Sequence, residues 1–264
     1  MKRLVLFLFR KRVILGLLLL VVGLGLAVWT VRTLRQEKNS AAWQRIDRFG
    51  IQVPLAYSVH GIDVSHHNQK INWQKVRAMR VNERDGRELR LEFVFIKATE
   101  GTTLTDRYFR QNWREARTVG LRRGAYHFYL PRRDPEKQAR HFIRTVQLQP
   151  GDFAPVLDFE VDRGVKPDQL VADLRRWLDL VEEEYGVKPI IYTNSHLYRR
   201  YVAGKLDDYP IWLADYSRED LREYRNKPLY LWQHSQSGAV SGIRGRVDFN
   251  VFLYSSERMQ EICL

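Results

Sequence analysis

Short apolar runs alternate along most of the chain with longer segments that are apolar at helical spacing. Each run is rich in branched or aromatic residues and is bounded by polar, Gly or Pro positions, which is typical of a buried strand. Eight such runs predict strands, at residues 59–64, 92–96, 124–129, 153–160, 188–193, 210–214, 229–234 and 247–253. Since helical segments separate the first of these strands, the pattern predicts a parallel sheet.

The helical segments have recognisable ends. Asn72 and Asp134 are expected N-terminal caps, Gly120 ends a third helix, and the strongest pattern runs from Pro167 to Gly186. The first five strands are followed by good helices, and the last three by weaker or shorter connections. The fold class predicted from this order is α/β, an irregular TIM-like (β/α) barrel of eight strands whose helices are weakened in the C-terminal third.

The N-terminal segment has a different character. Residues 13–31 contain no charge and are long enough to cross a bilayer as a single transmembrane helix, and five basic residues precede them. We expect a basic cytoplasmic tail at 1–12, an anchor at 13–31, a stalk at 32–57 and an extracytoplasmic globular domain at 58–264. The alternative is a cleaved signal peptide, because small residues at 25–27 offer a cleavage site.

Composition narrows the function classes. The formal charge is +13, but residues 1–38 hold eight Lys or Arg and one Glu, so +7 lies there and +6 in the remainder. The sequence contains no nucleic-acid-binding module, and we expect no nucleic-acid partner. The single cysteine, Cys263, excludes an intrachain disulfide. No His spacing resembles a zinc motif, so we expect no metal and no cofactor, and no feature indicates an oligomer.

Two carboxylates one residue apart end the central apolar run. Side chains at i and i+2 of a strand point to the same face, so Asp158 and Glu160 are expected side by side. Paired carboxylates push each other's pKa values apart, so that one stays protonated beside an ionised neighbour, which is what acid-catalysed glycoside cleavage requires. The alternative is that both acids only cap a helix or pair with surface arginines.

Acids and aromatic residues recur at the expected C-terminal ends of the other strands, where a barrel carries its working residues. This composition is typical of a carbohydrate cleft, since rings stack on sugar faces and carboxylates or amides bind hydroxyls. The candidates are Asp63, Lys97, Glu100, Tyr126, His127, Tyr192, Trp212, Asp215, Tyr216, Trp232, Gln233, Asp248 and Asn250. Tyr126, Tyr192 and Trp232 have the alternative of being core aromatics, and Lys97 and Glu100 that of a structural ion pair.

Eight segments together resemble glycoside hydrolase family 25, the Chalaropsis-type lysozymes or N-acetylmuramidases. The resemblance covers roughly residues 58–254, in the order of the family. The matching segments are Gly-Ile-Asp-Val-Ser-His at 61–66, Phe-Ile-Lys-Ala-Thr-Glu-Gly at 95–101, Gly-Ala-Tyr-His-Phe at 124–128, Val-Leu-Asp-Phe-Glu at 156–160, Ile-Tyr-Thr-Asn at 191–194, Ile-Trp-Leu-Ala-Asp-Tyr at 211–216, Trp-Gln at 232–233 and Val-Asp-Phe-Asn at 247–250.

The resemblance implies hydrolysis of the β-1,4 bond between N-acetylmuramic acid and N-acetylglucosamine in peptidoglycan. By position it implies that Glu160 is the general acid, that Asp158 is its partner carboxylate and that Asp63 and Asp248 are the other two acids of the cleft. The nucleophile is either the substrate's own acetamido group or an enzyme carboxylate. The alternatives are a glycan-binding barrel without turnover and a hydrolase of another N-acetylhexosamine polymer. An anchored muramidase suits envelope remodelling.

Overall fold

The computed structural model describes residues 23–26, 29–30, 43–82, 86 and 88–264. The expected basic tail lies outside the described residues, and so does most of the expected anchor at 13–31. Within the described ranges, no helix has both the length and the apolar character needed to span a bilayer. Residues 45–264 form one compact unit.

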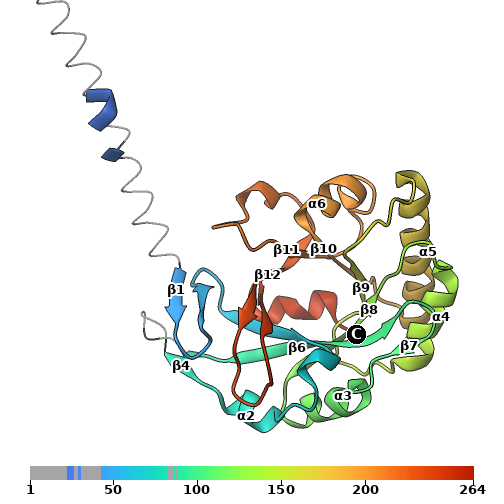
Figure 1. Cartoon of the computed structure of the whole chain (residues 1–264), viewed down its shortest axis with the longest axis horizontal. Helices are drawn as coiled ribbons and strands as arrows, with labels where there is room; N and C mark the ends of the chain where they lie inside the picture. The colour runs from blue at the N-terminus through green and yellow to red at the C-terminus, as the bar shows by residue number, and fades with distance from the viewer. Residues whose placement is uncertain (1–22, 27–28, 31–42, 83–85, 87) are drawn as a thin grey trace, which may run out of the picture. The chain divides into compact units, whose positions relative to one another are not determined.

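The core of this unit is a closed barrel (Figure 1). The sheet order is β3-β13-β12-β11-β10-β9-β8-β6-β7, and a further pairing of β3 with β6 closes the ring, with short β7 outside it. All eight predicted strands are present. Their bounds are β3 Val59–Val64, β6 Leu91–Glu100, β8 Arg122–Phe128, β9 Val156–Phe159, β10 Ile190–Asn194, β11 Ile211–Ala214, β12 Leu229–Gly238 and β13 Val247–Phe252; β7 is Leu104–Thr105.

The last strand corrects the prediction of a parallel sheet. Six neighbouring pairs, from β3–β6 round to β11–β12, are parallel, but β13 is antiparallel to both β12 and β3. The reason is the length of its connection. Only residues 239–246 join β12 to β13, too few for the crossover that a parallel neighbour needs.

Helices cover one part of the barrel only. The four predicted helices are present as α2 (Trp73–Ala78), α3 (Phe109–Thr118), α4 (Pro135–Thr145) and α5 (Pro167–Tyr185). After β10 come only α6 (Ser195–Leu197), the π-helical turn η2 (Tyr198–Val202) and the turn η3 (Arg222–Tyr224). The weakening of the helices is thus confirmed, although it begins one strand earlier than predicted.

A hairpin occupies part of the segment predicted to be a stalk. Strands β1 (Trp43–Ile46) and β2 (Ile51–Pro54) pair with each other, and Ile46, Phe49 and Val53 are buried. The Phe49 ring lies 4.8 Å from that of Phe249 in β13, and the Phe49 carbonyl accepts a 2.8 Å hydrogen bond from Ala239 N–H. The globular unit therefore begins before residue 58, because the hairpin buries apolar side chains against β12 and β13. A second small hairpin joins β4 (Val81–Asn82) and β5 (Glu88–Leu89).

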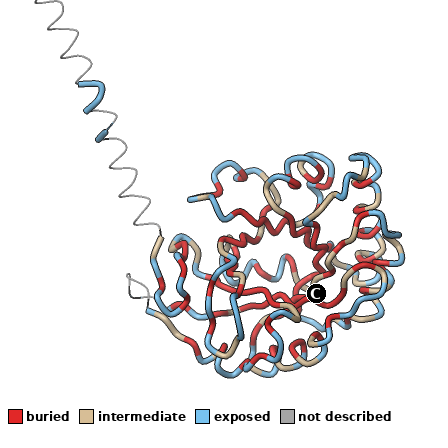
Figure 2. The backbone as a smooth tube through the Cα atoms, in the orientation of Figure 1, coloured by how far each residue is buried: buried red, intermediate tan, exposed pale blue. Residues whose placement is uncertain are grey.

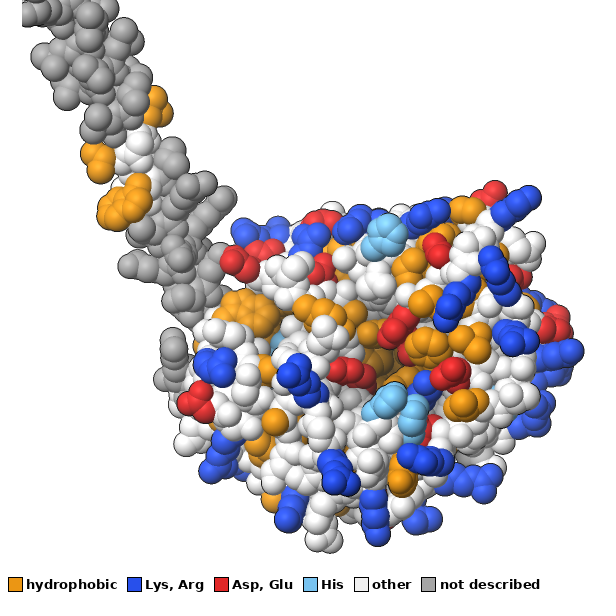
Figure 3. Space-filling view, in the orientation of Figure 1, with side chains coloured by type: hydrophobic (Ala, Val, Ile, Leu, Met, Phe, Trp, Pro, Cys, Tyr) orange, Lys and Arg blue, Asp and Glu red, His pale blue; other side chains and the backbone are white. Residues whose placement is uncertain are grey.

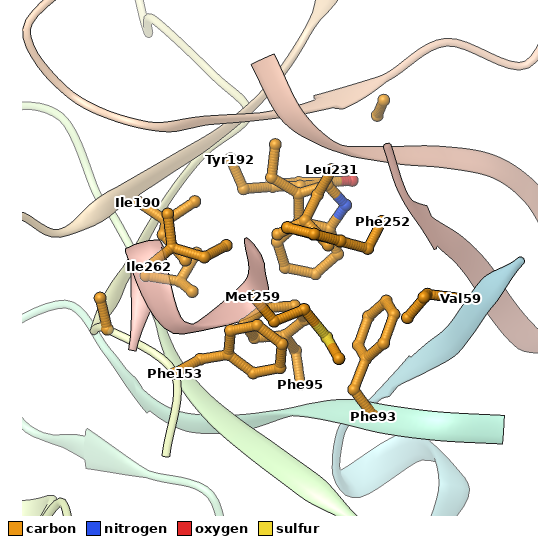
Figure 4. Packing of buried hydrophobic residues seen from close by; sticks show 14 residues of the cluster. Val59, Phe93, Phe95, Phe153, Ile190, Tyr192, Leu231, Phe252, Met259 and Ile262 are labelled. Atoms are coloured by element: carbon orange, nitrogen blue, oxygen red, sulfur yellow. The ribbon is translucent and has the colours of Figure 1, made fainter. Parts of the chain in front are cut away.

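The C-terminal segment closes one end of the barrel (Figure 4). The turn η4 (Ser256–Ile262) places Met259 and Ile262 in the cluster that holds Phe93, Phe95 and Phe153. Its backbone is fixed to the segment before β9, where Ala154 N–H donates to the Ile262 carbonyl at 2.9 Å. The strands themselves are almost wholly buried (Figure 2). A functional pocket within the barrel is therefore confined to the opposite end, at the C-terminal ends of the parallel strands.

Two glycines make room for the large rings in the interior. A Cβ built on Gly61 would lie 2.3 Å from the Phe93 ring, and one built on Gly124 would lie 2.3 Å from the Phe95 ring. The Phe95 ring has little room to move, since it stacks on Trp212 at 4.4 Å and packs against Phe153 at 4.9 Å. The absence of a side chain at these glycines is therefore a packing requirement.

We expect Gly124→Ala to lower the free energy of unfolding by about 1–3 kcal/mol, the usual cost of overpacking a core. Denaturant titration of the purified chain would measure it. Adding Phe95→Leu to Gly124→Ala should recover part of the loss, because the smaller side chain vacates the space that the new methyl group needs. A double variant whose loss equals the sum of the losses of Gly124→Ala and Phe95→Leu would contradict the explanation.

Candidate active site

A cavity of about 210 Å³ opens at the C-terminal ends of the strands. Figure 3 shows acidic side chains and histidines around a hollow on this face. Eight of the predicted site residues line the cavity, namely Asp63, Lys97, Tyr126, Asp158, Glu160, Tyr192, Trp212 and Asp248. All four acids that the sequence placed in the cleft are therefore brought together from β3, β9 and β13.

Strand alternation selects these side chains. In β9, Val156 and Asp158 point into the barrel, and Glu160, immediately after the strand, continues the same face. Val156 belongs to the apolar cluster beneath the cavity. The barrel interior is thus layered, with rings and aliphatic side chains below and ionisable groups above.

An amide network holds Asp63 from behind. Its Oδ2 accepts hydrogen bonds from Gln233 Nε2 and Asn250 Nδ2, both at 2.8 Å. Asn250 Oδ1 accepts from Trp212 Nε1 at 2.8 Å. Since an indole N–H can only donate, it fixes the orientation of the Asn250 amide and directs its NH₂ group at Asp63.

The Gln233 amide is oriented in the same way by two phenols. Its Oε1 accepts from Tyr192 Oη at 2.8 Å and from Tyr216 Oη at 2.5 Å. Gln233 and Asn250 are almost fully buried, whereas Tyr216 is 46% exposed. The two amides therefore support the pocket from behind, and Tyr216 lies at its edge.

The four carboxylic acids form two interacting pairs. Burial, with the nearby charge of Asp248, raises the pKa of Asp63 well above its ordinary value, and burial raises the pKa of Asp248 to about 6. Burial also raises the pKa of Asp158, to which the Glu160 charge adds, and burial raises the pKa of Glu160. The pocket therefore retains protons that four solvated carboxylic acids would have released.

The two members of the second pair differ in exposure. Asp158 is 5% exposed, and within the described part of the chain its buried Oδ1 has no hydrogen-bond partner. Glu160 keeps one side open to solvent. A buried acceptor without a donor is costly unless a ligand supplies one. The Asp158 side chain lines the pocket, so its carboxylate is placed to accept a hydrogen bond from a bound molecule.

Lys97 is the one cation among the lining residues of the pocket. It is 8% exposed, its Nζ lies 2.7 Å from Glu100 Oε2 and 4.7 Å from the centre of the Phe128 ring. Its charge pulls the pKa values of Asp158 and Glu160 back down against the larger effect of burial. Glu100 does not line the cavity. Its contact with Lys97 agrees with the alternative that these two residues form a structural ion pair.

The pH dependence of the free energy of unfolding should reveal the raised pKa of Asp248, the partner of Asp63. Burial raises the pKa of Asp248 from 3.8 to about 6, so in that interval the folded chain binds the proton more tightly than the unfolded chain does. The free energy of unfolding must therefore fall as the pH rises through this window. Asp248→Asn removes this contribution, which is at most about 3 kcal/mol at 1.4 kcal/mol per pKa unit.

We accordingly expect Asp248→Asn to lose less thermal stability than the wild-type chain between about pH 4 and pH 7. Melting temperatures measured at several pH values in that window would test this. Parallel curves for the two proteins would contradict the assignment.

His127 does not reach the cavity, which corrects the prediction for this residue. It is fully buried on the outer side of β8, where its ring bonds Thr99 Oγ1 at 2.8 Å and Gln138 Oε1 at 3.2 Å. The ring stacks on Trp177 of α5, with centroids 5.6 Å apart. Tyr126 points inward, so its immediate neighbour in the strand must point outward.

Trp232 and Asp215 also lie away from the cavity. Trp232 is the outward neighbour of Gln233, and its Nε1 donates to the Asp215 carbonyl at 2.9 Å. The Asp215 carboxylate accepts from Ser217 Oγ at 2.8 Å and from Arg218 Nε at 3.1 Å. Asp215 thus organises the loop after β11, and the core alternative holds for Trp232.

Three residues line the cavity that the sequence did not lead us to predict, namely Ser65, His67 and Phe128. Ser65 is two positions after Asp63, and Phe128 two after Tyr126, so alternation would have found both. His67 lies in the turn η1 (His66–Asn68), with its ring 4.0 Å from that of His66, whose Nδ1 is 3.3 Å from Asp106. Only the folded turn brings His67 to the pocket. Among the described residues, no group of three His, Cys, Asp or Glu could hold a metal ion.

The pocket has the parts needed for acid catalysis on a polar ligand. It holds carboxylic acids with raised pKa values beside other carboxylates, within an aromatic wall formed by Tyr126, Tyr192 and Trp212. A carboxylic acid that keeps its proton near neutral pH can protonate a leaving oxygen, and an ionised neighbour can stabilise developing positive charge. This combination favours cleavage of a glycosidic bond.

Known proteins are similar to this chain in sequence or in fold. The family model described as glycosyl hydrolases family 25 matches residues 62–243. Uncharacterized protein YegX of Escherichia coli strain K12 is 42% identical over 224 residues, covering 83% of this chain and 78% of that protein. The autolytic lysozyme of Clostridium acetobutylicum is 33% identical over 193 residues, 73% of this chain and 55% of that protein. A family 25 glycosyl hydrolase structure from Bacillus anthracis aligns with a TM-score of 0.69 and 28% identity, over 84% of this chain and 98% of that one.

Proposed function

Since the chain belongs to glycosyl hydrolase family 25 and is a glycoside hydrolase of the lysozyme type, we propose that it cleaves the β-1,4 bond between N-acetylmuramic acid and N-acetylglucosamine in peptidoglycan. The observation that carries the proposal is the convergence of Asp63, Asp158, Glu160 and Asp248 in one pocket. A binding site alone has no need for four acids with raised pKa values.

Glu160 is proposed as the general acid. Its open side gives a glycosidic oxygen access to the proton, and burial of its other side raises the pKa of this carboxyl group. The charge of Asp63, which lines the same pocket as Asp248, raises the pKa of Glu160 further. As the leaving oxygen departs, positive charge develops on the sugar ring, and nearby carboxylates stabilise it.

Asp158 is proposed to assist at the sugar carbon. Its carboxylate lines the pocket, where it can accept the N–H of the substrate's acetamido group and orient that group for attack on the anomeric carbon. The alternative is direct attack by an enzyme carboxylate. Both routes give a product that retains its anomeric configuration, so stereochemistry alone does not distinguish them.

Product analysis tests the proposal. The full chain in neutral detergent would be incubated with purified peptidoglycan, and the released fragments reduced and identified by mass spectrometry. Muramidase cleavage places reduced muramic acid at the new end of each fragment. Reduced glucosamine ends would indicate a hydrolase of the other bond. Binding to the polymer without any fragments would indicate a glycan-binding barrel instead.

The location is proposed from the sequence of residues 13–31. An uncharged segment of this length with basic residues before it would anchor the chain in the cytoplasmic membrane and hold the barrel on the outer side. Tethering would restrict cleavage to peptidoglycan near the membrane, which suits envelope remodelling. Resistance of the membrane-bound chain to alkaline carbonate extraction would support the anchor, and full release would contradict it.

A further inference from the structure

A second and larger cavity lies outside the barrel, between α3 and the end of α4. It has a volume of about 690 Å³ and is separate from the catalytic pocket, with which it shares no residue. It is lined by Phe109, Arg110, Trp113, Arg114, Arg117, Thr118, Arg123, Arg144, Thr145, Gln147 and Gln149. We refer to it as the arginine groove. Five of its lining residues are arginines, and none is acidic.

The arginines are arranged for an external ligand. Arg110, Arg114 and Arg117 are spaced at i, i+4 and i+7, so they lie on one face of α3, and Arg144 belongs to α4. All four are exposed. Over the part of the chain that the structure describes, no ion pair is found for Arg110, Arg114 or Arg144, whereas most other exposed arginines of these helices and their neighbours have a carboxylate close by.

The wall of the groove is rigid. Arg123 is 4% exposed, and its guanidinium lies 3.9 Å from the centre of the Trp113 ring. It donates to Asp152 Oδ1 at 2.8 Å, to Asp152 Oδ2 at 3.0 Å and to the Trp113 carbonyl at 2.6 Å. Asp152 also lies 3.9 Å from Arg117. The charge of Asp152 is already balanced by Arg123. Asp152 therefore does little to offset the positive charge of the other arginines.

The groove runs along the outside of α3, from Arg110 in the first turn of the helix toward the closed end of the barrel. Arg123 stands near the beginning of β8, whereas Tyr126 and Phe128 of the same strand line the pocket near its end. Gln147 and Gln149 belong to the segment that leads into β9 from the closed end. A surface bound where the groove meets the closed end, at Arg117, Arg123 and Arg144, would therefore leave the catalytic pocket facing away from it.

We propose that the arginine groove binds the phosphate groups of anionic phospholipids and thereby orients the barrel on the membrane. Guanidinium groups present paired donors that match phosphate oxygens, and every cation in the groove is an arginine. The inference rests on the proposed membrane location. Eleven residues, 32–42, separate the expected anchor from β1. Even fully extended they reach only about 40 Å, so an anchored chain would keep β1 within that distance of the bilayer.

This orientation deepens the proposed function. With the closed end of the barrel on the lipid and the pocket facing outward, the enzyme would meet glycan strands that lie above the membrane. Each basic residue near an anionic surface improves binding roughly fivefold, so neutralising three arginines should weaken the contact on the order of 100-fold. Salt should weaken it as well, because it screens charges at this distance.

The test uses the full chain in bilayers of phosphatidylcholine, with or without about 30% phosphatidylglycerol, a content that gives a strongly anionic surface. Flotation of the chain with bilayers of phosphatidylcholine alone would show that the expected anchor attaches it to the membrane. Hydrogen–deuterium exchange then reports the groove: residues 109–118 and 144–149 should exchange several-fold more slowly only where phosphatidylglycerol is present, and about 0.5 M NaCl should remove the difference. Peptidoglycan cleavage in detergent, measured in parallel, reports the proposed activity independently.

Matched variants make the result specific. Combined Arg110→Gln, Arg114→Gln and Arg144→Gln substitutions should abolish the phosphatidylglycerol-dependent protection and leave detergent activity unchanged. A control with the same loss of charge, Arg133→Gln, Arg200→Gln and Arg225→Gln, should keep the protection, since these exposed residues lie outside the groove. Equal exchange in both bilayers, equal effects of the two triple variants, or protection by added peptidoglycan instead of phosphatidylglycerol would overturn the proposal.

Discussion

Glu160→Gln is expected to reduce the rate of peptidoglycan cleavage by about 10²–10⁴-fold, the usual contribution of a general acid. The amide has the size of the carboxyl group but no proton of useful acidity. Since burial raises the pKa of Glu160, the wild-type rate should also fall as the pH rises and this proton is lost. Release of reduced muramic acid ends from purified peptidoglycan would measure both effects.

Glu183→Gln provides the control for this variant. Glu183 lies on the exposed side of α5, away from the pocket, so the same chemical change there should leave the rate unaltered. Equal melting temperatures for Glu160→Gln and wild type would show that the barrel remains folded. A Glu160→Gln enzyme that keeps more than about a tenth of the wild-type rate would exclude Glu160 as the general acid.

Asp158→Asn should have the second largest effect, a loss of about 10²–10³-fold in kcat, the size expected when one group that stabilises transition-state charge is removed. The amide cannot supply a full negative charge to the acetamido group or to the sugar carbon. Burial and the Glu160 charge raise the pKa of Asp158, which means that the ionised side chain is costly to the folded state near neutral pH. We therefore expect Asp158→Asn to melt at the same temperature as wild type or higher while it loses activity.

A modified substrate separates the two mechanisms for Asp158. Peptidoglycan whose muramic acid residues lack the N-acetyl group cannot supply the acetamido nucleophile. If Asp158 acts by orienting that group, the wild-type enzyme should not cleave this polymer. Cleavage at an undiminished rate would favour direct attack by an enzyme carboxylate. A variant that loses stability along with activity would leave Asp158 as a structural residue only.

Local pattern in the sequence was sufficient for much of the fold and for the acids of the site. Period-two and period-3.6 patterns are set by which side of an element is buried, so they predicted all eight barrel strands and helices α2 to α5. The resemblance to family 25 is confirmed by the family match and the solved structure. The spacing of Asp158 and Glu160 already placed both on one face, because alternation is a property of any strand.

Choosing between adjacent candidates needed the barrel itself. Tyr126 and His127, or Trp232 and Gln233, are equally polar or aromatic neighbours at a strand end, yet only Tyr126 lines the pocket and only Gln233 reaches Asp63. By alternation, two neighbouring residues of a strand cannot both face the barrel interior. The closure of the sheet decides which of the two does.

Contacts between distant segments were decided by the tertiary structure alone. The pairing of β13 with β3, the cover formed by β1 and β2, the closure of the barrel by η4 and the gathering of Arg144 with the α3 arginines all join residues far apart in sequence. The sequence by itself determined which segments bury one face and which residue types could do chemistry. Which of those faces and residues meet depends on how the ring of strands closes, and no local period encodes that.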